Sequence, residues 1–258
     1  MLIENTLFGV RDKVQIAIDR IRQFEPPEGY YVAFSGGKDS CVVLDLVKRA
    51  GVKYDAHYNL TTVDPPELVY FIREHHADVE VHTPKETMWQ LIERKADVPT
   101  RGVRWCCSIL KEGGGNGRTV ITGVRWAESA RRSKRKMVEF CSGKGKSFLQ
   151  PVIDWSDDDV WEYIHTNDLP YCSLYDEGFK RIGCILCPMT TNHDKAFERF
   201  PKIADAYKRS MNKAFTIMAE RKKRNGAKLI WKNGDDWFKW WISKPTRKVD
   251  PDQTVIFE

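Results

Sequence analysis

Hydrophobic and polar positions follow two periods in turn along the chain, and this change of period predicts an α/β fold. Apolar runs of strand length occur at Tyr30–Phe34, in "VKYDAHYNL" (52–60), in "VEVHTP" (79–84) and in "RTVITGV" (118–124). Apolar residues recur at helical spacing between these runs, over 39–49, 64–75 and 88–95. Strands that alternate with helices form parallel sheets covered on both faces, so we predict a doubly wound, mostly parallel α/β sheet.

The two ends of the chain carry helical patterns instead. An N-terminal helix is predicted over about Leu7–Phe24, where two prolines follow. "SDDDVWEYIHTNDLP" predicts a short helix capped by Ser156, with Asp159 at its third position. After about His193 the pattern is helical and basic, and it ends in the aromatic stretch "DDWFKWWISKP". We therefore divide the chain into an N-terminal helix (1–28), a central α/β domain (29–193) and a helical, aromatic-rich C-terminal extension (194–258).

The aromatic residues of that extension have two interpretations. Trp237, Phe238, Trp240 and Trp241 fall within five positions. We expect them to dock the last helix onto the main domain, because aromatic side chains bury large areas. A stacking surface for a partner or a nucleic acid is the alternative.

Composition then narrows the class of protein. Hydrophobic residues make up 41% and aromatic residues 12%, which is typical of a globular protein. The opening "MLIENTLFGVRDKV" reaches charged residues too early for a signal peptide, and no apolar run approaches membrane-spanning length. We expect a cytoplasmic protein with no membrane partner. Its seven cysteines then favour metal, cluster or core roles over disulfides, and its six histidines show no metal-ligand spacing.

Positive charge is concentrated in one segment. The net charge is +6, and residues 125–146 alone hold eight Lys/Arg and two Glu. Such a segment attracts phosphate groups, either on a nucleotide or on a nucleic acid. A solvated basic loop is the alternative interpretation.

The stretch "VAFSGGKDSCVV" (32–43) places small and polar residues where a strand becomes a helix. Two glycines allow a tight turn that directs backbone N–H groups at a ligand, and the helix start favours an anion. Lys38 adds a full positive charge. The spacing differs from the GxxxxGK[ST] loop of other nucleotide triphosphatases. We predict a phosphate-binding loop made of Ser35, Gly36, Gly37, Lys38, Asp39 and Ser40, with a simple glycine turn as the alternative.

"SGGKDS" resembles the pyrophosphate-binding loop of the N-type ATP pyrophosphatases, which include the phosphoadenosine phosphosulfate (PAPS) and adenosine phosphosulfate (APS) reductases. "VDPPEL" (63–68), "TGVRWAESARR" (122–132) and "PVIDWSDDDVWEYIHTNDLPYCSLYDEGFKRIGCILCP" (151–188) resemble further motifs of the reductases, although Leu68 replaces a threonine. The resemblance implies an adenine nucleotide alpha hydrolase-like fold that binds an adenine nucleotide. Besides the loop, it implies nucleotide contacts from Asp64, Glu67, Gly123, Arg125, Arg131 and Arg132. We also expect Asp64 to cap the helix that follows it, with Pro65 at the first helical position.

Four cysteines form a second candidate site. Cys106 and Cys107 are adjacent, and Cys184 and Cys187 form a CxxC pair. Thiolates at such spacings bind zinc or an iron–sulfur cluster, and adjacent cysteines suit the separate iron corners of a cubane better than one tetrahedral ion. Zinc and uninvolved thiols remain alternatives. The resemblance to APS reductases implies a [4Fe-4S] cluster.

The remaining three cysteines are outside that set. Cys41 follows the loop at a helix start, and we expect it to pack into the core. Cys141 and Cys172 are interpreted as structural residues, with a reactive thiol as the alternative.

Two departures from the reductase pattern decide the predicted activity. The reductases generally carry a degraded phosphate loop, whereas "SGGKDS" has every polar position, and no cysteine follows Cys187 to act as their nucleophile. We therefore predict an ATP pyrophosphatase-type enzyme that uses ATP and Mg²⁺ to adenylate an acceptor for sulfur transfer. Lys38, Asp39 and Arg125 are its predicted catalytic residues.

The predicted partners follow from the same resemblance. The features are similar to those of the reductase-like enzymes of DNA phosphorothioation, which makes a nucleic acid a candidate acceptor and a cysteine desulfurase a candidate sulfur donor. A sulfonucleotide reductase that releases sulfite is the second hypothesis. A non-catalytic nucleotide-sensing or nucleic-acid-binding module is the third.

Overall fold

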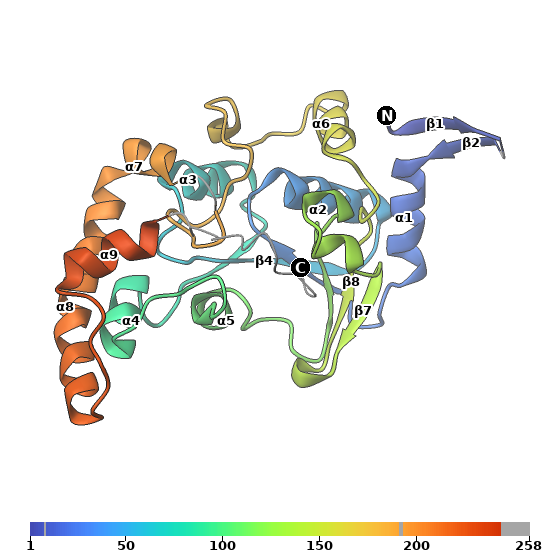
Figure 1. Cartoon of the computed structure of the whole chain (residues 1–258). Helices are drawn as coiled ribbons and strands as arrows, with labels where there is room; N and C mark the ends of the chain where they lie inside the picture. Colours follow the sequence, from blue (N-terminus) through green and yellow to red (C-terminus); the bar gives the residue numbers. More distant parts are fainter. Residues whose placement is uncertain (8, 191–192, 244–258) are drawn as a thin grey trace, which may run out of the picture. The chain divides into compact units, whose positions relative to one another are not determined.

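The computed structural model describes residues 1–7, 9–190 and 193–243, apart from the side chain of Lys144. The chain forms two compact units, coloured along the sequence in Figure 1. Unit 1 comprises Met1–Met88 and Trp105–Ile185, and unit 2 comprises Trp89–Arg104 and Leu186–Glu258. This division differs from the predicted domains, because residues 89–104 pack with the C-terminal helices. The end of the predicted extension, residues 244–258, lies outside the described residues.

Unit 1 contains a six-stranded sheet in the order β5-β4-β3-β6-β8-β7. All neighbouring strands pair in parallel except β7 and β8, which form an antiparallel hairpin at one edge. The prediction of a mostly parallel sheet is thus confirmed. The strands are β3 (Tyr30–Phe34), β4 (Tyr54–Asn59), β5 (Glu80–His82), β6 (Thr119–Ile121), β7 (Val138–Cys141) and β8 (Lys146–Leu149).

Helices cover both faces of this sheet. The side chains of each strand alternate between the two faces and pack against these helices. On one face the Tyr30 hydroxyl donates to the carbonyl of Ile21, 2.8 Å away, in α1 (Lys13–Gln23). Phe34 contacts His76 on that same face, with ring centroids 4.7 Å apart. Tyr31 points to the opposite face, where the chain after the short α5 (Trp105–Leu110) packs against it. Figure 1 shows α2 (Lys38–Ala50) and α3 (Pro66–His75) on the first side and α5 on the other.

Helix α6 (Asp157–Thr166) also belongs to unit 1, and its start matches the prediction. The Ser156 hydroxyl accepts from the Asp159 N–H at 3.0 Å, and the Asp159 carboxylate accepts from the Ser156 N–H at 2.8 Å. This reciprocal pair is the expected capping box. Four short 3₁₀ turns complete the unit, at η1 (Trp126–Glu128), η2 (Arg132–Lys134), η3 (Ser142–Lys144) and η4 (Ser173–Tyr175).

Two predicted helix starts are wrong. The N-terminal segment first forms a hairpin of β1 (Ile3–Thr6) and β2 (Gly9–Asp12), and α1 begins only at Lys13. Asp12 sets that start, because its carboxylate caps the first N–H groups of α1. Asp64 does not cap α3, because its carboxylate accepts from the N–H of Thr61 at 2.6 Å and Pro65 takes the cap position.

Unit 2 is helical, as the pattern after His193 predicts. It contains α7 (Asp194–Arg199), α8 (Pro201–Arg224) and α9 (Gly234–Ile242), together with α4 (Met88–Lys95) beyond its first residue. The carbonyl of Trp89 in α4 accepts from Ser210 of α8 at 2.9 Å, and the Trp241 indole of α9 donates to the Pro99 carbonyl at 2.7 Å. Trp237, Phe238 and Trp241 are buried and hold α9 in this unit, whereas Trp240 is 46% exposed.

None of the described helices in either unit is long and apolar enough to cross a membrane.

The neighbouring histidines His75 and His76, at the end of α3, have different surroundings. His75 is exposed, whereas His76 packs against Phe34 and Phe71 and is 8% exposed. Burial lowers the pKa of His76 from 6.5 to about 4. Since the unfolded chain binds a proton below pH 6.5 that the folded chain does not, acid destabilises the fold through this residue.

We expect the free energy of unfolding to fall as the pH drops from 6.5 to about 4, by up to about 3 kcal/mol from His76 alone. In His76→Gln this part of the pH dependence should disappear, while His75→Gln should keep it. Urea unfolding at several pH values measures the difference. Equal pH dependence in all three proteins would contradict the effect of burial.

Candidate functional site

The predicted phosphate-binding loop joins β3 to α2, in the expected strand–turn–helix setting. Gly36 has a φ of 70°, in the left-handed region, and Gly37 is the N-terminal cap of α2 without a side-chain cap bond. The Ser40 hydroxyl donates to the Gly37 carbonyl at 2.8 Å and accepts from the Ser35 N–H at 3.2 Å. The two serines therefore close the loop on itself at the start of a 13-residue helix.

Gly36 is required by close packing as well as by its backbone angle. A methyl group there would lie 2.7 Å from Leu68 Cδ1 and 2.8 Å from Ile72 Cδ1, both in α3. Leu68 stands where the reductase motif has threonine, and it is 2% exposed beneath the loop. Helix α3 thus supports the loop from below.

Gly36→Ala should destabilise unit 1 more than Gly51→Ala. Both glycines have a φ of 70°, so both substitutions carry a left-handed penalty of about 1–2 kcal/mol. Only Gly36 also faces a clash, since no atom lies within 4 Å of a methyl group at Gly51. Overpacking adds about 1–3 kcal/mol, which thermal unfolding of the two variants measures. Equal destabilisation would show that α3 yields to the extra methyl group.

Two buried cations and two carboxylates form a network behind the loop. Lys38 and Arg125 are 5% and 2% exposed. Arg125 donates through Nε to Asp39 Oδ1 at 2.6 Å and through Nη2 to Asp157 Oδ1 at 3.0 Å. Lys38 Nζ lies 2.9 Å from the same oxygen of Asp157 and 3.5 Å from Asp39 Oδ2. Asp157 therefore bridges both cations.

The charges in this network stabilise one another. Burial alone opposes ionisation of Asp157, but the hydrogen bonds and charges of Lys38 and Arg125 outweigh it and lower its pKa. Burial likewise opposes the charge on Arg125, and Asp39 outweighs it and raises the pKa of the guanidinium. The Asp157 side chain is nevertheless 61% exposed, so the bridging carboxylate is the part of the network that meets solvent.

The other predicted nucleotide contacts lie in different surroundings. Gly123 approaches the loop closely, because a methyl group there would lie 2.8 Å from the Asp39 carbonyl. Arg132 pairs with Glu128, and Arg131 is exposed at the start of η2. Glu67 is half-buried in the first turn of α3.

Part of the basic segment is structural, which the charge count did not predict. The Lys146 ammonium is buried and donates to the Glu112 carbonyl at 2.9 Å and to the Gly114 carbonyl. Arg135 pairs with Glu139 within the same segment. The segment also contains β7 and the first residue of β8, and the surrounding lysines and arginines obscure the strand pattern. Less positive charge is therefore free to meet a ligand than the sequence indicates.

Sequence reasoning missed two residues that contact the loop, Tyr175 and Asp157. The Tyr175 hydroxyl accepts from the Lys38 N–H at 2.9 Å, and the Lys38 ammonium lies 5.9 Å from the centre of the Tyr175 ring. Burial raises the pKa of Tyr175, which keeps the hydroxyl protonated. Asp157 is the other. It lies in the acidic "SDDD" run, which indicated helix capping alone, while Tyr175 carries no local signal.

Three of the four predicted cluster cysteines belong to unit 1. Cys106 and Cys107 lie in α5, and the Cys184 thiol donates to the Thr61 hydroxyl at 3.4 Å. Lys111 follows α5, and its N–H donates to the Cys107 carbonyl at 2.9 Å. The residue as a whole is exposed, but its ammonium hydrogen-bonds to Cys184.

The Lys111 ammonium places a positive charge beside Cys184, Asp64 and Cys107. Burial opposes its charge, but Cys184, Asp64 and Cys107 outweigh burial and raise its pKa. Asp64 therefore belongs to the cysteine region as much as to the nucleotide motif. Burial raises the pKa of Cys184, and Lys111 counteracts only part of that effect.

The fourth cysteine, Cys187, is described with unit 2, because the boundary between the units falls inside the CxxC pair. Its carbonyl accepts from the Thr190 N–H at 2.8 Å and lies 3.2 Å from His193 Nε2. Outside the predicted set, Cys41 and Cys172 are buried, and burial raises the pKa of both thiols. The expected core role of Cys41 is therefore confirmed. Cys141 is exposed on the edge strand β7.

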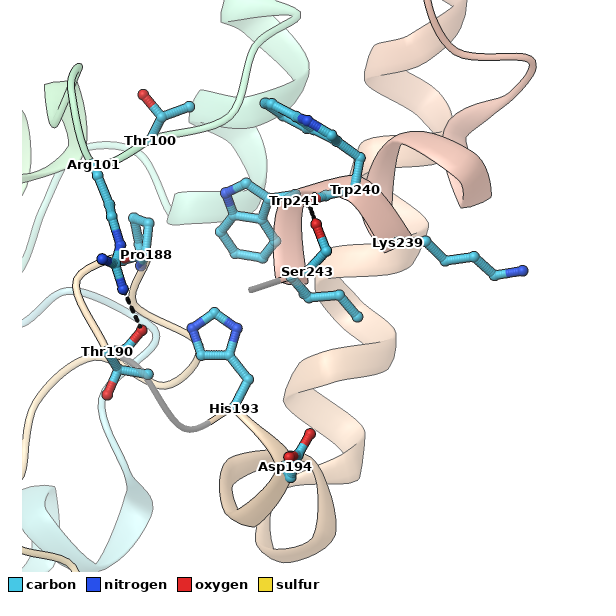
Figure 2. A pocket seen from close by; sticks show the side chains of 11 residues that line it. Thr100, Arg101, Pro188, Thr190, His193, Asp194, Lys239, Trp240, Trp241 and Ser243 are labelled. Atoms are coloured by element: carbon cyan, nitrogen blue, oxygen red, sulfur yellow. Dashed lines mark hydrogen bonds between the residues drawn. The ribbon is translucent and has the colours of Figure 1, made fainter. Parts of the chain in front are cut away.

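Unit 2 has a pocket of about 700 Å³. Part of its lining, Pro188, Thr190 and His193, follows Cys187 in the sequence. Figure 2 shows the indole rings of Trp240 and Trp241 on one side and Arg101 on the other, with His193 between them. Arg101 is fixed by donating to the carbonyls of Pro188 at 2.9 Å and Thr190 at 3.3 Å. The predicted aromatic cluster thus lines a pocket as well as docking α9.

The histidines have no ligand spacing in the sequence, but the fold brings two of them together. His57 and His82 are 25 positions apart in the sequence, but parallel pairing of β4 with β5 brings His57 Nδ1 within 2.8 Å of His82 Nε2. Glu80 completes a group whose ligand atoms all lie within 4.8 Å of one another. A ligand set assembled across two strands leaves no local motif in the sequence.

The parallel α/β sheet and the glycine loop at the end of β3 define a protein of the nucleotide-binding α/β class. Residues 29–190, well over half of the chain, match the phosphoadenosine phosphosulfate reductase domain. The chain belongs to this family. The predicted recognition and fold are both confirmed.

Curated relatives of this chain include an uncharacterized protein and a reductase. The chain is 30% identical over 198 residues to an uncharacterized protein of Methanocaldococcus jannaschii, covering 72% of this chain and 46% of that protein. It is also 30% identical over 170 residues to an adenosine 5'-phosphosulfate reductase of Oceanobacillus iheyensis, covering 60% of this chain and 69% of that protein. The chain thus spans less than half of the M. jannaschii relative.

A solved structure supports the fold alone. The PAPS reductase of Candida auris, in a phosphate complex, has a TM-score of 0.51 and 21% sequence identity. The match covers 65% of this chain and 87% of that chain.

Proposed function

We propose that this protein is an ATP pyrophosphatase-type member of the family, which adenylates an acceptor in preparation for sulfur transfer. The observation that carries the proposal is the intact loop. A buried ammonium, that of Lys38, lies at the first position of α2, and its partner Asp157 is exposed enough to be replaced by a phosphate. A degraded loop of the kind that serves a single phosphate would not need this concentration of positive charge.

The chemistry is a displacement at phosphorus. An acceptor oxygen attacks the α-phosphate of ATP, the bond to the bridging oxygen of the β-phosphate breaks, and pyrophosphate leaves with the electron pair. Lys38 and the N-terminus of α2 stabilise the charge that grows on the leaving pyrophosphate. Arg125 is a positioning residue in this scheme, because its guanidinium is buried against Asp39 and Asp157 and orients both.

Asp39, the carboxylate of the loop, does not suit the role of a magnesium ligand. Arg125 lies 2.6 Å from one of its oxygens and Lys38 lies 3.5 Å from the other. A carboxylate flanked by two cations is a poor ligand for a hard cation, which prefers oxygens that are free to turn towards it. We therefore derive no step through magnesium bound at Asp39.

The cysteine region of unit 1 contains three of the four sulfur donors that the predicted iron–sulfur cluster would use. Cys106, Cys107 and Cys184 offer sulfur, and the Lys111 ammonium beside Cys184 offsets negative charge on thiolates. We propose that these residues and Cys187 hold a [4Fe-4S] cluster. When bound, the cluster would carry electrons or sulfur, while Lys111 and Thr61 would hold the Cys184 sulfur in place.

Sulfonucleotide reduction is the second candidate. It is favoured by curated relatives that are named as adenosine 5'-phosphosulfate reductases, with identities of about 30% over 60% of this chain. Within the 258 residues no cysteine follows Cys187, so the thiolate that attacks sulfur would have to be Cys41, Cys141 or Cys172. The first and last of these are buried.

Anaerobically purified protein should release pyrophosphate from ATP in the presence of acceptor nucleic acid, and should release no sulfite from APS or PAPS with thioredoxin. Lys38→Ala should weaken ATP binding about ten- to a hundredfold, because it removes a charge-assisted contact of roughly 1.5–3 kcal/mol. Calorimetry measures the binding, and separate assays measure the two products.

Lys48→Ala is the matched control, since Lys48 lies in the last turn of the same helix and pairs with Asp78 on the surface. It should bind ATP like the unaltered protein. Sulfite release that persists after Cys41, Cys141 and Cys172 are all replaced would overturn both the proposed activity and the account of the nucleophile.

A further inference from the structure

A cluster of side chains that could bind a metal ion lies on the sheet face opposite α2, where Tyr31 stacks on His57. Strand β5 is the edge strand and pairs in parallel with β4, so that His57 aligns with Glu80 and Asn59 aligns with His82. Because alternate residues of a strand share a face, His57, Glu80 and His82 all point to one side.

The distances within this group match those between ligands of one metal ion. His57 Nδ1 lies 2.8 Å from His82 Nε2 and 3.4 Å from Glu80 Oε2. Zinc binds nitrogen at about 2.0–2.1 Å in tetrahedral geometry, which separates two ligand atoms by about 3.3 Å. These two separations lie on either side of that value, so small rotations of the side chains would place all three atoms around one ion.

The surroundings of His57 fix which nitrogen can bind a metal. Its Nε2 faces the carboxylate of Asp55, which Arg118 holds with a contact of 2.7 Å from Nη1. Tyr31 stacks on the ring with centroids 4.1 Å apart and planes 8° apart. The proton of neutral His57 therefore stays on Nε2, and the lone pair of Nδ1 points at His82 and Glu80. Carboxylates orient metal-binding histidines in this way.

Glu80 orients the second histidine while it supplies a ligand of its own. Its Oε1 lies 3.7 Å from His82 Nδ1, so the proton of His82 can stay on Nδ1 and leave Nε2 for the metal. The side chains of His82 and Glu80 are 39% and 66% exposed, whereas that of His57 is 9% exposed. The group is thus rigid on its inner side and open to solvent on its outer side.

We propose that His57, Glu80 and His82 bind a divalent transition-metal ion, with zinc as the best match to two imidazoles and one carboxylate. Three protein ligands and an open side leave one position for water. The ion would fix the edge strand β5 to β4. A direct hydrogen bond between the two histidines is the competing account, and it predicts that the group takes up no zinc.

The test is titration of the chelator-treated full-length protein with Zn²⁺, followed by calorimetry and elemental analysis. His82→Ala should lose one equivalent of zinc, and Asp55→Asn should bind that equivalent about 10- to 100-fold more weakly. Cys184→Ser should keep it, which separates this site from the cysteine region, and His75→Ala should also keep it. ATP binding has no part in this measurement, so its outcome is independent of the proposed function.

A second readout guards against misfolded variants. Zn²⁺ should raise the melting temperature of the unaltered protein and of Cys184→Ser but not of His82→Gln, because a ligand that binds only the folded state stabilises it. The same zinc stoichiometry and affinity in His82→Ala as in the unaltered protein would overturn the proposal. So would the same thermal shift in His82→Gln.

Discussion

Arg125→Ala is expected to destabilise unit 1 by about 3–5 kcal/mol, the usual cost of removing one partner of a buried ion pair. Arg125 is 2% exposed, and its guanidinium contacts Asp39, Asp157 and the Trp155 carbonyl. Without it, Asp39 keeps a charge at the start of α2 with only the distant Lys38 contact of 3.5 Å to offset it. Urea unfolding followed by circular dichroism measures the loss.

Two variants make this result specific. Arg131→Ala removes the same charge from an exposed position and should change stability by less than about 0.5 kcal/mol. Arg125→Lys keeps the charge but cannot reach both carboxylates with a planar fork, so it should recover only part of the loss. If Arg125→Ala were as stable as Arg131→Ala, the network would not hold the loop in place.

Cys184→Ser is expected to abolish iron binding. Anaerobically purified protein should be brown and carry about four irons per chain, as thiolate-bound cubane clusters do. Cys106, Cys107 and Cys187 should be equally sensitive to serine, because each would supply one iron corner. Iron analysis and the visible absorption spectrum measure the result.

Cys41→Ser is the matched control, since Cys41 is a buried cysteine of unit 1 that is 3.8 Å from the Gly36 carbonyl and the His76 ring. It should keep its iron and its colour. Stoichiometric zinc without iron, after anaerobic preparation, would rule out the cluster and favour the zinc alternative.

The sheet and the loop were predictable because each rests on a local pattern. Strand β3 has the predicted bounds, Tyr30–Phe34, since five apolar residues between turn signals have few other uses. The loop follows from residues that are adjacent in the sequence, and the Ser156–Asp159 capping box is equally local. These features need no knowledge of the rest of the fold.

The missed features depend on contacts between distant residues. Asp157 meets Lys38 across more than a hundred positions, and His57 meets His82 only because β5 pairs with β4 in one register. The N-terminal hairpin was missed because the helical spacing of apolar residues begins at Leu7, before Asp12. Asp12 nevertheless caps α1, so the helix begins only at Lys13. Residues 89–104 likewise pack with α8, and no change in composition along the sequence predicts this packing.

The bridging position of Asp157 changes how selectivity at the loop should be understood. Lys38 and Arg125 already share a carboxylate, so an arriving anion exchanges with a resident counter-ion and does not fill an empty positive site. An exchange of this kind sets a threshold, because only a ligand with more charge than one carboxylate gains by displacing it. We expect monovalent anions such as chloride and acetate to compete weakly at the loop and polyphosphates to compete well. The Asp157 carboxylate would thus keep abundant monovalent anions from binding at the loop.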